Sequence, residues 1–244
     1  KAIELFDRAH KIDQDRGDFT DNLIKAFESA AQSMTHAARY PAAIKTLERA
    51  LVMRPGDVSL TCRMSFVLSA AKRNGEALAA ADRAISKDPE SAQAHDVRGL
   101  ALLGLGQSDH AITSFRTALD CDLKYAPAFS NLGLAYRVQG EPRDAISCFD
   151  EAIRLDENNP GAYNNLGISL LDVNDLTQAE SALRSALSIE PDYAEAHYNL
   201  SRVLLMAEDF ETGWKQNEWR WLCADFPSTW REFPQAMWQG EDLI

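Results

Sequence analysis

The sequence predicts an all-α protein in which antiparallel helix pairs stack one after another. Small residues recur at intervals of 34 positions, larger apolar residues form a second series with the same interval, and prolines close several of the repeats. A fixed interval of this length is typical of helical repeat proteins. One helix pair cannot bury both of its faces alone, so successive pairs must pack against each other.

The most regular series is a small residue near the start of each predicted second helix. It consists of Ala43, Ala77, Ala111, Ala145, Ala179 and Gly213. In the predicted first helices, Gly99, Gly133 and Gly167 recur with the same spacing. Small residues are required where two helices cross so closely that a larger side chain would clash.

Larger residues lie between the small ones and fill the space between neighbouring helix pairs. The series reads Leu47, Ala81, Phe115, Phe149 and Leu183, in which only Ala81 is small. Pro55, Pro89 and Pro191 follow second helices. Proline ends a helix because it has no N–H to donate and clashes with the preceding turn.

These series divide the chain into repeats. We expect six repeats over residues 24–223, starting near residues 24, 58, 92, 126, 160 and 194, with the last one degenerate. Residues 1–13 match the second helix of a further, truncated repeat. We expect an inserted loop over residues 14–22, because Gly17 and several Asp residues favour a turn, with Asp21 as the N-cap of the next helix.

The pattern of small residues resembles the tetratricopeptide repeat (TPR) family position by position. This resemblance implies a right-handed α-solenoid, the TPR superhelix. It also implies that the first helices line a concave groove, which binds a peptide or protein partner in that family.

Composition restricts the function further. The net charge of −12 argues against nucleic acid as a partner, since phosphate binding requires clustered Lys and Arg. That charge suits a neutral or basic polypeptide, or serves only to keep the protein soluble. No apolar run is long enough to span a membrane. The four cysteines form no CxxC pair, which favours a reduced, cytoplasmic protein. No metal, cofactor or catalytic motif is predicted.

One series of polar residues is a candidate for peptide binding. Asn131, Asn165 and Asn199 recur at the same interval on predicted first helices. An Asn side chain both donates and accepts, so a ladder of Asn could hold a peptide backbone, and this ladder resembles that of O-linked N-acetylglucosamine transferases. Alternatively, each Asn bonds within its own helix pair. Neighbouring candidates for the groove are Ser130, Asn164, Tyr198, Arg137, Asp172 and Arg202.

All five tryptophans lie near the C-terminal end, where residues 224–244 read as an irregular tail or an interdomain linker. They are Trp214, Trp219, Trp221, Trp230 and Trp238. Such large rings either cap the last repeat or dock onto another domain.

Residues 210–221 and 233–243 resemble the end of the TPR segment in bacterial TPR–glycosyltransferase fusion proteins. The resemblance implies that this chain recruits substrate for a catalytic domain located beyond residue 244, and is not itself an enzyme. The alternative is a free-standing TPR scaffold that assembles a complex. Self-association through the solenoid ends is a further expectation.

Overall fold

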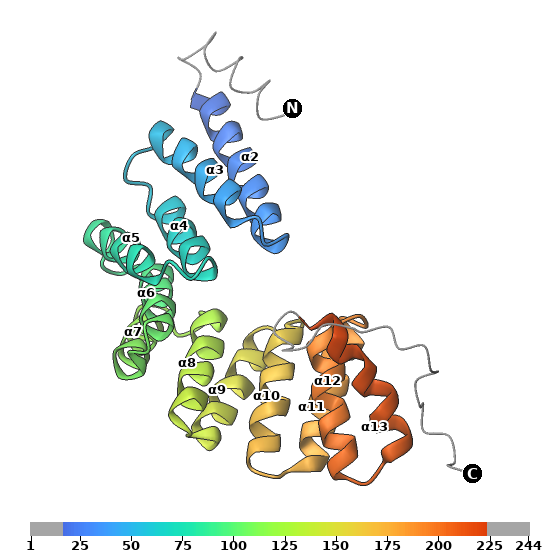
Figure 1. Ribbon diagram of the computed structural model, residues 1–244. Coiled ribbons are helices and arrows are strands. Elements are labelled where there is room, and N and C mark those ends of the chain that lie inside the picture. The colour runs from blue at the N-terminus through green and yellow to red at the C-terminus, as the bar shows by residue number, and fades with distance from the viewer. Residues whose placement is uncertain (1–16, 224–244) are drawn as a thin grey trace, which may run out of the picture. The chain divides into compact units, whose positions relative to one another are not determined.

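The computed structural model describes residues 17–223, and within that range the chain is helical with no strand (Figure 1). The elements are α2 (Gly17–His36), α3 (Tyr40–Met53), α4 (Val58–Ala70), α5 (Asn74–Lys87), α6 (Ala92–Gly104), α7 (Ser108–Cys121), α8 (Ala126–Gln139), α9 (Pro142–Leu155), α10 (Pro160–Asp172), α11 (Leu176–Ile189), α12 (Ala194–Met206), α13 (Phe210–Asn217) and a short 3₁₀ helix, η1 (Glu218–Leu222). The predicted all-α class is confirmed. The predicted helix over 1–13 and the tail over 224–244 lie outside the described residues.

The described residues divide into two compact units, residues 17–131 and residues 132–223, and α8 contains the boundary. In the first unit α2 packs on α3, α4 on α5 and α6 on α7, while in the second α10 packs on α11 and α12 on α13. Neighbouring first helices also touch, α2 with α4 and α4 with α6 in one unit, and α10 with α12 in the other. Each unit is therefore a stack of helix pairs, as the predicted α-solenoid requires.

Helix starts recur at the interval seen in the sequence. The helices α4, α6, α8, α10 and α12 begin at residues 58, 92, 126, 160 and 194. Short polar side chains fix several of these starts: Asp57, Ser91 and Asn159 accept a hydrogen bond from the backbone N–H three residues ahead. Such caps satisfy N–H groups that have no partner within the helix.

The inserted loop predicted over residues 14–22 is wrong for its described part, because residues 17–22 belong to α2. Asp21 is accordingly not an N-cap. Its carboxylate lies inside α2 and pairs with Arg54, which follows α3. An apolar stripe comprising Leu23, Phe27 and Ala31 is fully buried at helical spacing. That stripe anchors α2, and the helix continues from it through Asp21 to Gly17.

The repeated glycines lie where the sequence places helix crossings. A Cβ atom added to Gly99 would lie 2.4 Å from the Phe115 ring, and one added to Gly133 would lie 2.8 Å from Phe149. Both phenylalanines are fully buried. The glycine thus makes room for the large side chain sixteen residues later.

All four cysteines, Cys62, Cys121, Cys148 and Cys223, are free thiols. No helix in the described range is long and apolar enough to cross a bilayer.

The turn within each of several helix pairs contains one residue with positive φ, a conformation that favours glycine. Gly106 and Gly140 adopt it at φ 75° and 79°, and Lys72 and Glu208 adopt it at 61° and 65°. We expect Glu208→Gly to raise the free energy of unfolding by about 1 kcal/mol and Gly140→Ala to lower it by about 1 kcal/mol.

Urea unfolding followed by circular dichroism measures both changes. Gly75→Ala is the control, because Gly75 lies in α5, has no positive φ and has open space around its Cβ position. There the same Gly→Ala change should stabilise by roughly 0.5–1 kcal/mol. Destabilisation by both Gly→Ala changes would contradict the role assigned to the turn.

Candidate functional site

A pocket of about 360 Å³ lies on the first-helix face of the first unit, between α4 and α6. Its lining residues are Phe66, Ser69, Ala70, Lys72, Asn74, Leu100, Leu103 and Gly104. Phe66 and Leu100 occupy the same position in consecutive repeats, as do Ser69 and Leu103. The pocket is therefore a product of the repeat, with mainly apolar walls.

Two features make this pocket suitable for a ligand. The Phe66 side chain is 47% exposed, although it belongs to a helix whose other apolar residues are largely buried. The hydroxyl of Ser69 is buried and has no hydrogen-bond partner within the described residues. A buried polar group without a partner is costly, so rotation of the Ser69 side chain toward a ligand in the pocket would relieve that cost.

One end of the pocket is shaped by a contact between two repeats. The Asn74 side chain donates a hydrogen bond of 2.7 Å to the carbonyl of Gly104, at the end of α6. A Cβ atom on residue 104 would lie 2.6 Å from that amide, so glycine permits the contact. The amide satisfies a carbonyl that has no partner within its helix.

The asparagine series did not predict this pocket, because none of its residues lines it. An apolar series with the same interval of 34 residues could have indicated it. The series consists of Phe66, Leu100, Leu134 and Ile168. Leu134 and Ile168 belong to the second unit and are partly buried there. A partly exposed apolar position that recurs on a helix face is typical of a binding surface.

The amides of two residues of the asparagine series make hydrogen bonds between neighbouring first helices. The Asn199 amide donates a 3.0 Å hydrogen bond to Asn164 Oδ1, and the two residues are only 7% and 5% exposed. Asn131 Nδ2 donates a 2.8 Å bond to Asp96 Oδ1. Asn164 and Asn199 therefore satisfy each other in this structure, and their direct contact with a peptide stays a prediction. These bonds do not stay within one helix pair, as the alternative held, because they join neighbouring first helices.

These bonds belong to a wider pattern, in which polar side chains 35 residues apart pair between neighbouring first helices. The other members are ion pairs, Arg63 Nε with Glu28 Oε1 at 3.7 Å and Arg137 Nε with Asp172 Oδ2 at 3.6 Å. The separation of 35 residues exceeds the repeat interval of 34 by one. Each side chain therefore contacts a residue next to the equivalent position of the neighbouring repeat, not the equivalent residue itself. We infer that this pattern fixes the register of successive repeats.

The remaining predicted groove residues are divided between the two units. In the second unit, Asn165 is partly buried and its carbonyl accepts a bond from Ser169. Tyr198 is partly buried, and the exposed Arg202 donates to Asn199 Oδ1 at 3.3 Å. In the first unit, the Ser130 hydroxyl is buried without a hydrogen-bond partner within the described residues. Direct contact of these residues with a peptide stays a prediction.

Asp96 is an unexpected feature of the first-helix face. It is 4% exposed, and burial raises the pKa of its carboxyl to about 7, an effect that the hydrogen bond from Asn131 opposes. Burial, reinforced by the charge of Asp96, raises the pKa of the Cys62 thiol to about 12. Within the described residues, no group of three or more His, Cys, Asp or Glu side chains could hold a metal ion.

Two of the tryptophans pack near the last helix pair. The Trp219 ring stacks on His197 with centroids 4.0 Å apart and 15° between planes, and η1 contacts α12 and α13. The Arg220 guanidinium lies 4.4 Å from the centre of the Trp221 ring. Trp214 is 42% exposed. These contacts favour a capping role for Trp219, whereas Trp230 and Trp238 lie outside the described residues.

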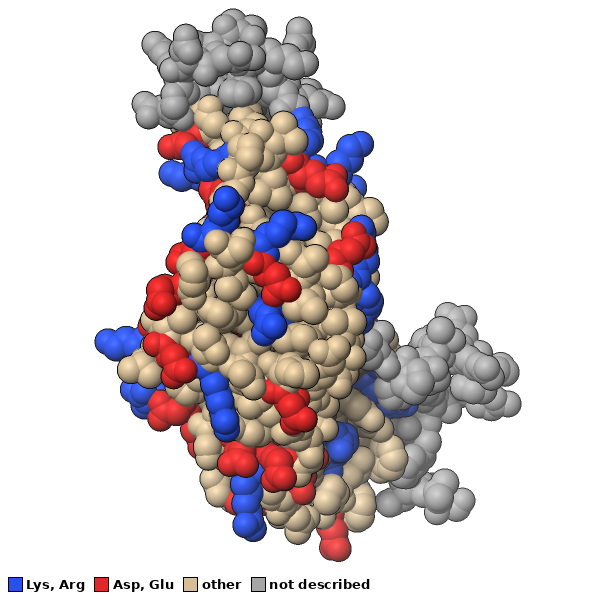
Figure 2. All heavy atoms as spheres, turned by 90° about the vertical axis from the view of Figure 1, so that its left-hand side faces the viewer, with Lys and Arg blue, Asp and Glu red and all other residues tan. Residues whose placement is uncertain are grey.

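Charged side chains are distributed rather than gathered on the face shown in Figure 2. Lys and Arg alternate there with Asp and Glu, with neutral surface between them. That face therefore offers a mixed surface, without the continuous basic area that a phosphate backbone requires.

Comparison with known proteins gives the same fold. Four family profiles, each described as tetratricopeptide repeat, match residues 67–126, 126–159, 148–181 and 170–212. Together they span residues 67–212, which is more than half of the chain. No curated protein matches the sequence.

Several solved structures resemble the chain at low sequence identity. TTC0263, a thermophilic TPR protein from Thermus thermophilus, is 21% identical with a TM-score of 0.69, over 75% of this chain and 99% of its own. PilW, a type IV pilus biogenesis factor, is 19% identical with a TM-score of 0.67, over 85% and 95%. YrrB, described as a TPR protein with an unusual peptide-binding site, is 22% identical with a TM-score of 0.53, over 71% and 89%. With its helix pairs, its interval and these profile matches, the chain belongs to the tetratricopeptide repeat family.

Proposed function

We propose that this chain is a protein-interaction module that binds an extended polypeptide on its first-helix face, with an apolar side chain of the ligand seated between Phe66 and Leu100. The observation that carries the proposal is the pocket between α4 and α6. Its apolar walls suit a Leu, Met or Phe side chain, and burial of such a side chain contributes about 1.5–3 kcal/mol.

The polar groups at this pocket favour an extended ligand. The Ser69 hydroxyl is buried and has no hydrogen-bond partner among the described residues, so its side chain must change rotamer before it can bond a peptide N–H or C=O. Lys72 lies at the rim and can pair with an acidic ligand side chain or a carboxylate. An extended chain exposes backbone groups that need such partners, which a helix satisfies internally.

The proposal is tested by selecting ligands from a random 12-residue peptide library with the purified chain. We expect enrichment of peptides that contain a large apolar residue. We also expect Phe66→Asp to weaken their binding at least about tenfold in calorimetry, because a carboxylate in the pocket would be desolvated without a partner.

Leu123→Asp is the matched control. Leu123 is as apolar and is 75% exposed, but it lies in the loop between α7 and α8. Its replacement should leave the affinity unchanged. Equal losses for the two variants, or none for Phe66→Asp, would contradict the assignment of the site to the first-helix face.

Two versions of this function are compatible with the sequence. Recruitment of substrate for a bacterial protein glycosyltransferase is supported by the resemblance of residues 210–221 and 233–243, of which the second stretch lies outside the described residues. A free-standing scaffold, with self-association as an option, is equally compatible with the fold and the family. A glycosyltransferase domain encoded directly after Ile244 would select the first version, and a stop codon there would select the second. A cytoplasmic location stays a prediction in both.

A further inference from the structure

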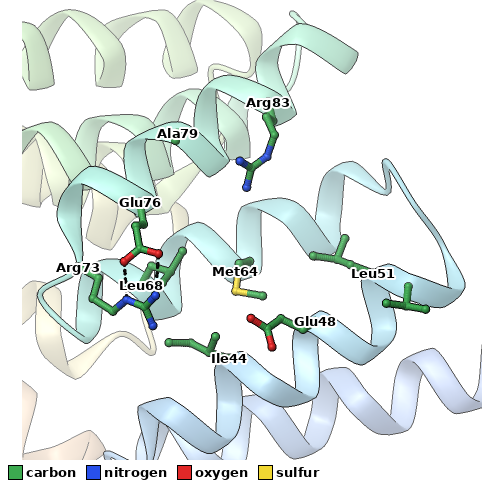
Figure 3. A pocket seen from close by; sticks show the side chains of 10 residues that line it. Ile44, Glu48, Leu51, Met64, Leu68, Arg73, Glu76, Ala79 and Arg83 are labelled. Atoms are coloured by element: carbon green, nitrogen blue, oxygen red, sulfur yellow. Dashed lines mark hydrogen bonds and ion pairs between the residues drawn. The ribbon is translucent and has the colours of Figure 1, made fainter.

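A second pocket lies on the second-helix face of the first unit, between α3 and α5, and α4 forms its floor (Figure 3). Its volume is about 500 Å³. The helices α3 and α5 are the second helices of consecutive repeats, and the pocket shows that they stand apart while α4 fills the space beneath them. This groove shares no lining residue with the pocket proposed above.

The floor of the groove is apolar. Ile44, Met64 and Leu68 form it, each less than 9% exposed, and Leu51 and Val52 extend it along α3. The Val52 side chain is 80% exposed, which leaves apolar surface in contact with water. Exposed apolar surface that continues into a groove is typical of an interaction site.

The walls carry opposite charges. Glu48 on α3 and Arg83 on α5 both point toward the space above Met64 (Figure 3). No hydrogen bond or ion pair of either charged group is found within residues 17–223. Arg73, by contrast, donates hydrogen bonds of 2.7 and 2.6 Å to Glu76 at one end of the groove. The hydrogen bond to Glu76 raises the pKa of Arg73, and the opposite charge of Glu48 contributes to that rise without forming an ion pair in the described part of the chain. Glu48 and Arg83 therefore present opposite signs to the two sides of a ligand.

We propose that this groove binds an amphipathic helix of a partner protein. The apolar stripe of the helix would contact Met64 and Leu68, a basic side chain would face Glu48, and an acidic side chain would face Arg83. A helix satisfies its own backbone hydrogen bonds, so it needs only the apolar floor and the charges that the groove provides. Two flanking helices form a trough of the kind into which a further helix packs at about 8–10 Å.

Three synthetic 16-residue helical peptides test the proposal. All carry the same Leu stripe; the first has Lys along one edge and Glu along the other, the second has Lys along both edges, and the third has Glu along both. Fluorescence anisotropy measures their binding to the complete chain. We expect the mixed peptide to bind about tenfold more tightly than the other two, because each of those places one like charge against a wall.

Charge reversal on one wall makes the test specific. Glu48→Lys leaves two basic walls and should transfer the preference to the peptide with Glu on both edges, and Arg83→Glu should transfer it to the peptide with Lys on both. Both side chains are exposed, so the fold should be retained, as circular dichroism would verify. Lys45→Glu, at an exposed position of α3 outside the groove, should leave the preference unchanged.

Other outcomes would overturn the inference. These are absence of binding, or a preference that neither wall variant changes. Phe66→Asp should not affect these peptides, and a loss with that variant would place them on the first-helix face instead. If sedimentation shows a dimer that Glu48→Lys dissociates, the occupant is a second copy of this chain rather than a partner helix.

Discussion

Replacing Phe115 by Ala lowers the free energy of unfolding by about 3–5 kcal/mol, the largest loss that we expect from a single substitution. The ring is fully buried against Gly99, and truncation leaves a cavity between two helices that cannot close further. Urea unfolding followed by circular dichroism measures the loss. Phe66→Ala is the control, because Phe66 is the same residue type with its side chain half exposed, and it should cost less than about 1 kcal/mol.

A double-mutant cycle tests whether the cause is size complementarity. Another repeat of the same chain places Ser65 and Ala81 at the positions of Gly99 and Phe115, and the Ser65 hydroxyl donates a 2.8 Å bond to the Ala77 carbonyl. We therefore expect Gly99→Ser to be destabilising alone, but to recover part of the loss when combined with Phe115→Ala. Simple addition of the two losses would contradict the pairing.

Replacing Asp96 by Asn makes the protein more stable at pH 8, by about 2–4 kcal/mol. Burial raises the pKa of the native carboxyl from an ordinary value of 3.8 to about 7. Between these two values the folded state binds a proton that the unfolded state has lost. The stability of the wild-type protein should therefore fall as the pH rises from about 4 to about 7 and then change no further through this group.

The amide of an Asn at position 96 can still accept the hydrogen bond from Asn131, so the variant removes the charge and keeps the contact. We expect the two proteins to have equal stability near pH 4 and to diverge as the pH increases. Urea unfolding at a series of pH values measures the difference. Asp120→Asn, at an exposed position of α7, should remain within about 0.5 kcal/mol of wild type throughout. A constant difference at all pH values would show that Asp96 is not protonated in the folded state.

The fold was predictable because the repeats of this one sequence can be aligned with one another. Ala77, Gly99 and Phe115 can each be compared with equivalent residues in other repeats, and their sizes alone identify the helix crossings. The start of α2 was not predictable in the same way. Gly17 and Asp21 are turn formers, yet in the structure both belong to α2, which is anchored further along by the buried Leu23 and Phe27.

The candidate site was less predictable. The sequence indicates which face of a helix a residue lies on, but not whether its side chain is available to a ligand or bonded to a neighbouring helix. Asn199 is at a position that faces the groove in the family. Its amide nevertheless donates a hydrogen bond to Asn164 of the neighbouring first helix. That partner lies 35 residues away, an offset that a search at the repeat interval overlooks. Phe66 and Leu100 were visible as an apolar series, but their exposure depends on how α4 packs against α6.

The most direct test of the central claim is a crystal structure of the chain bound to a peptide selected from the library. We predict an extended peptide along α4 and α6, with an apolar side chain between Phe66 and Leu100. A peptide bound elsewhere, with the pocket between α4 and α6 empty, would contradict the account.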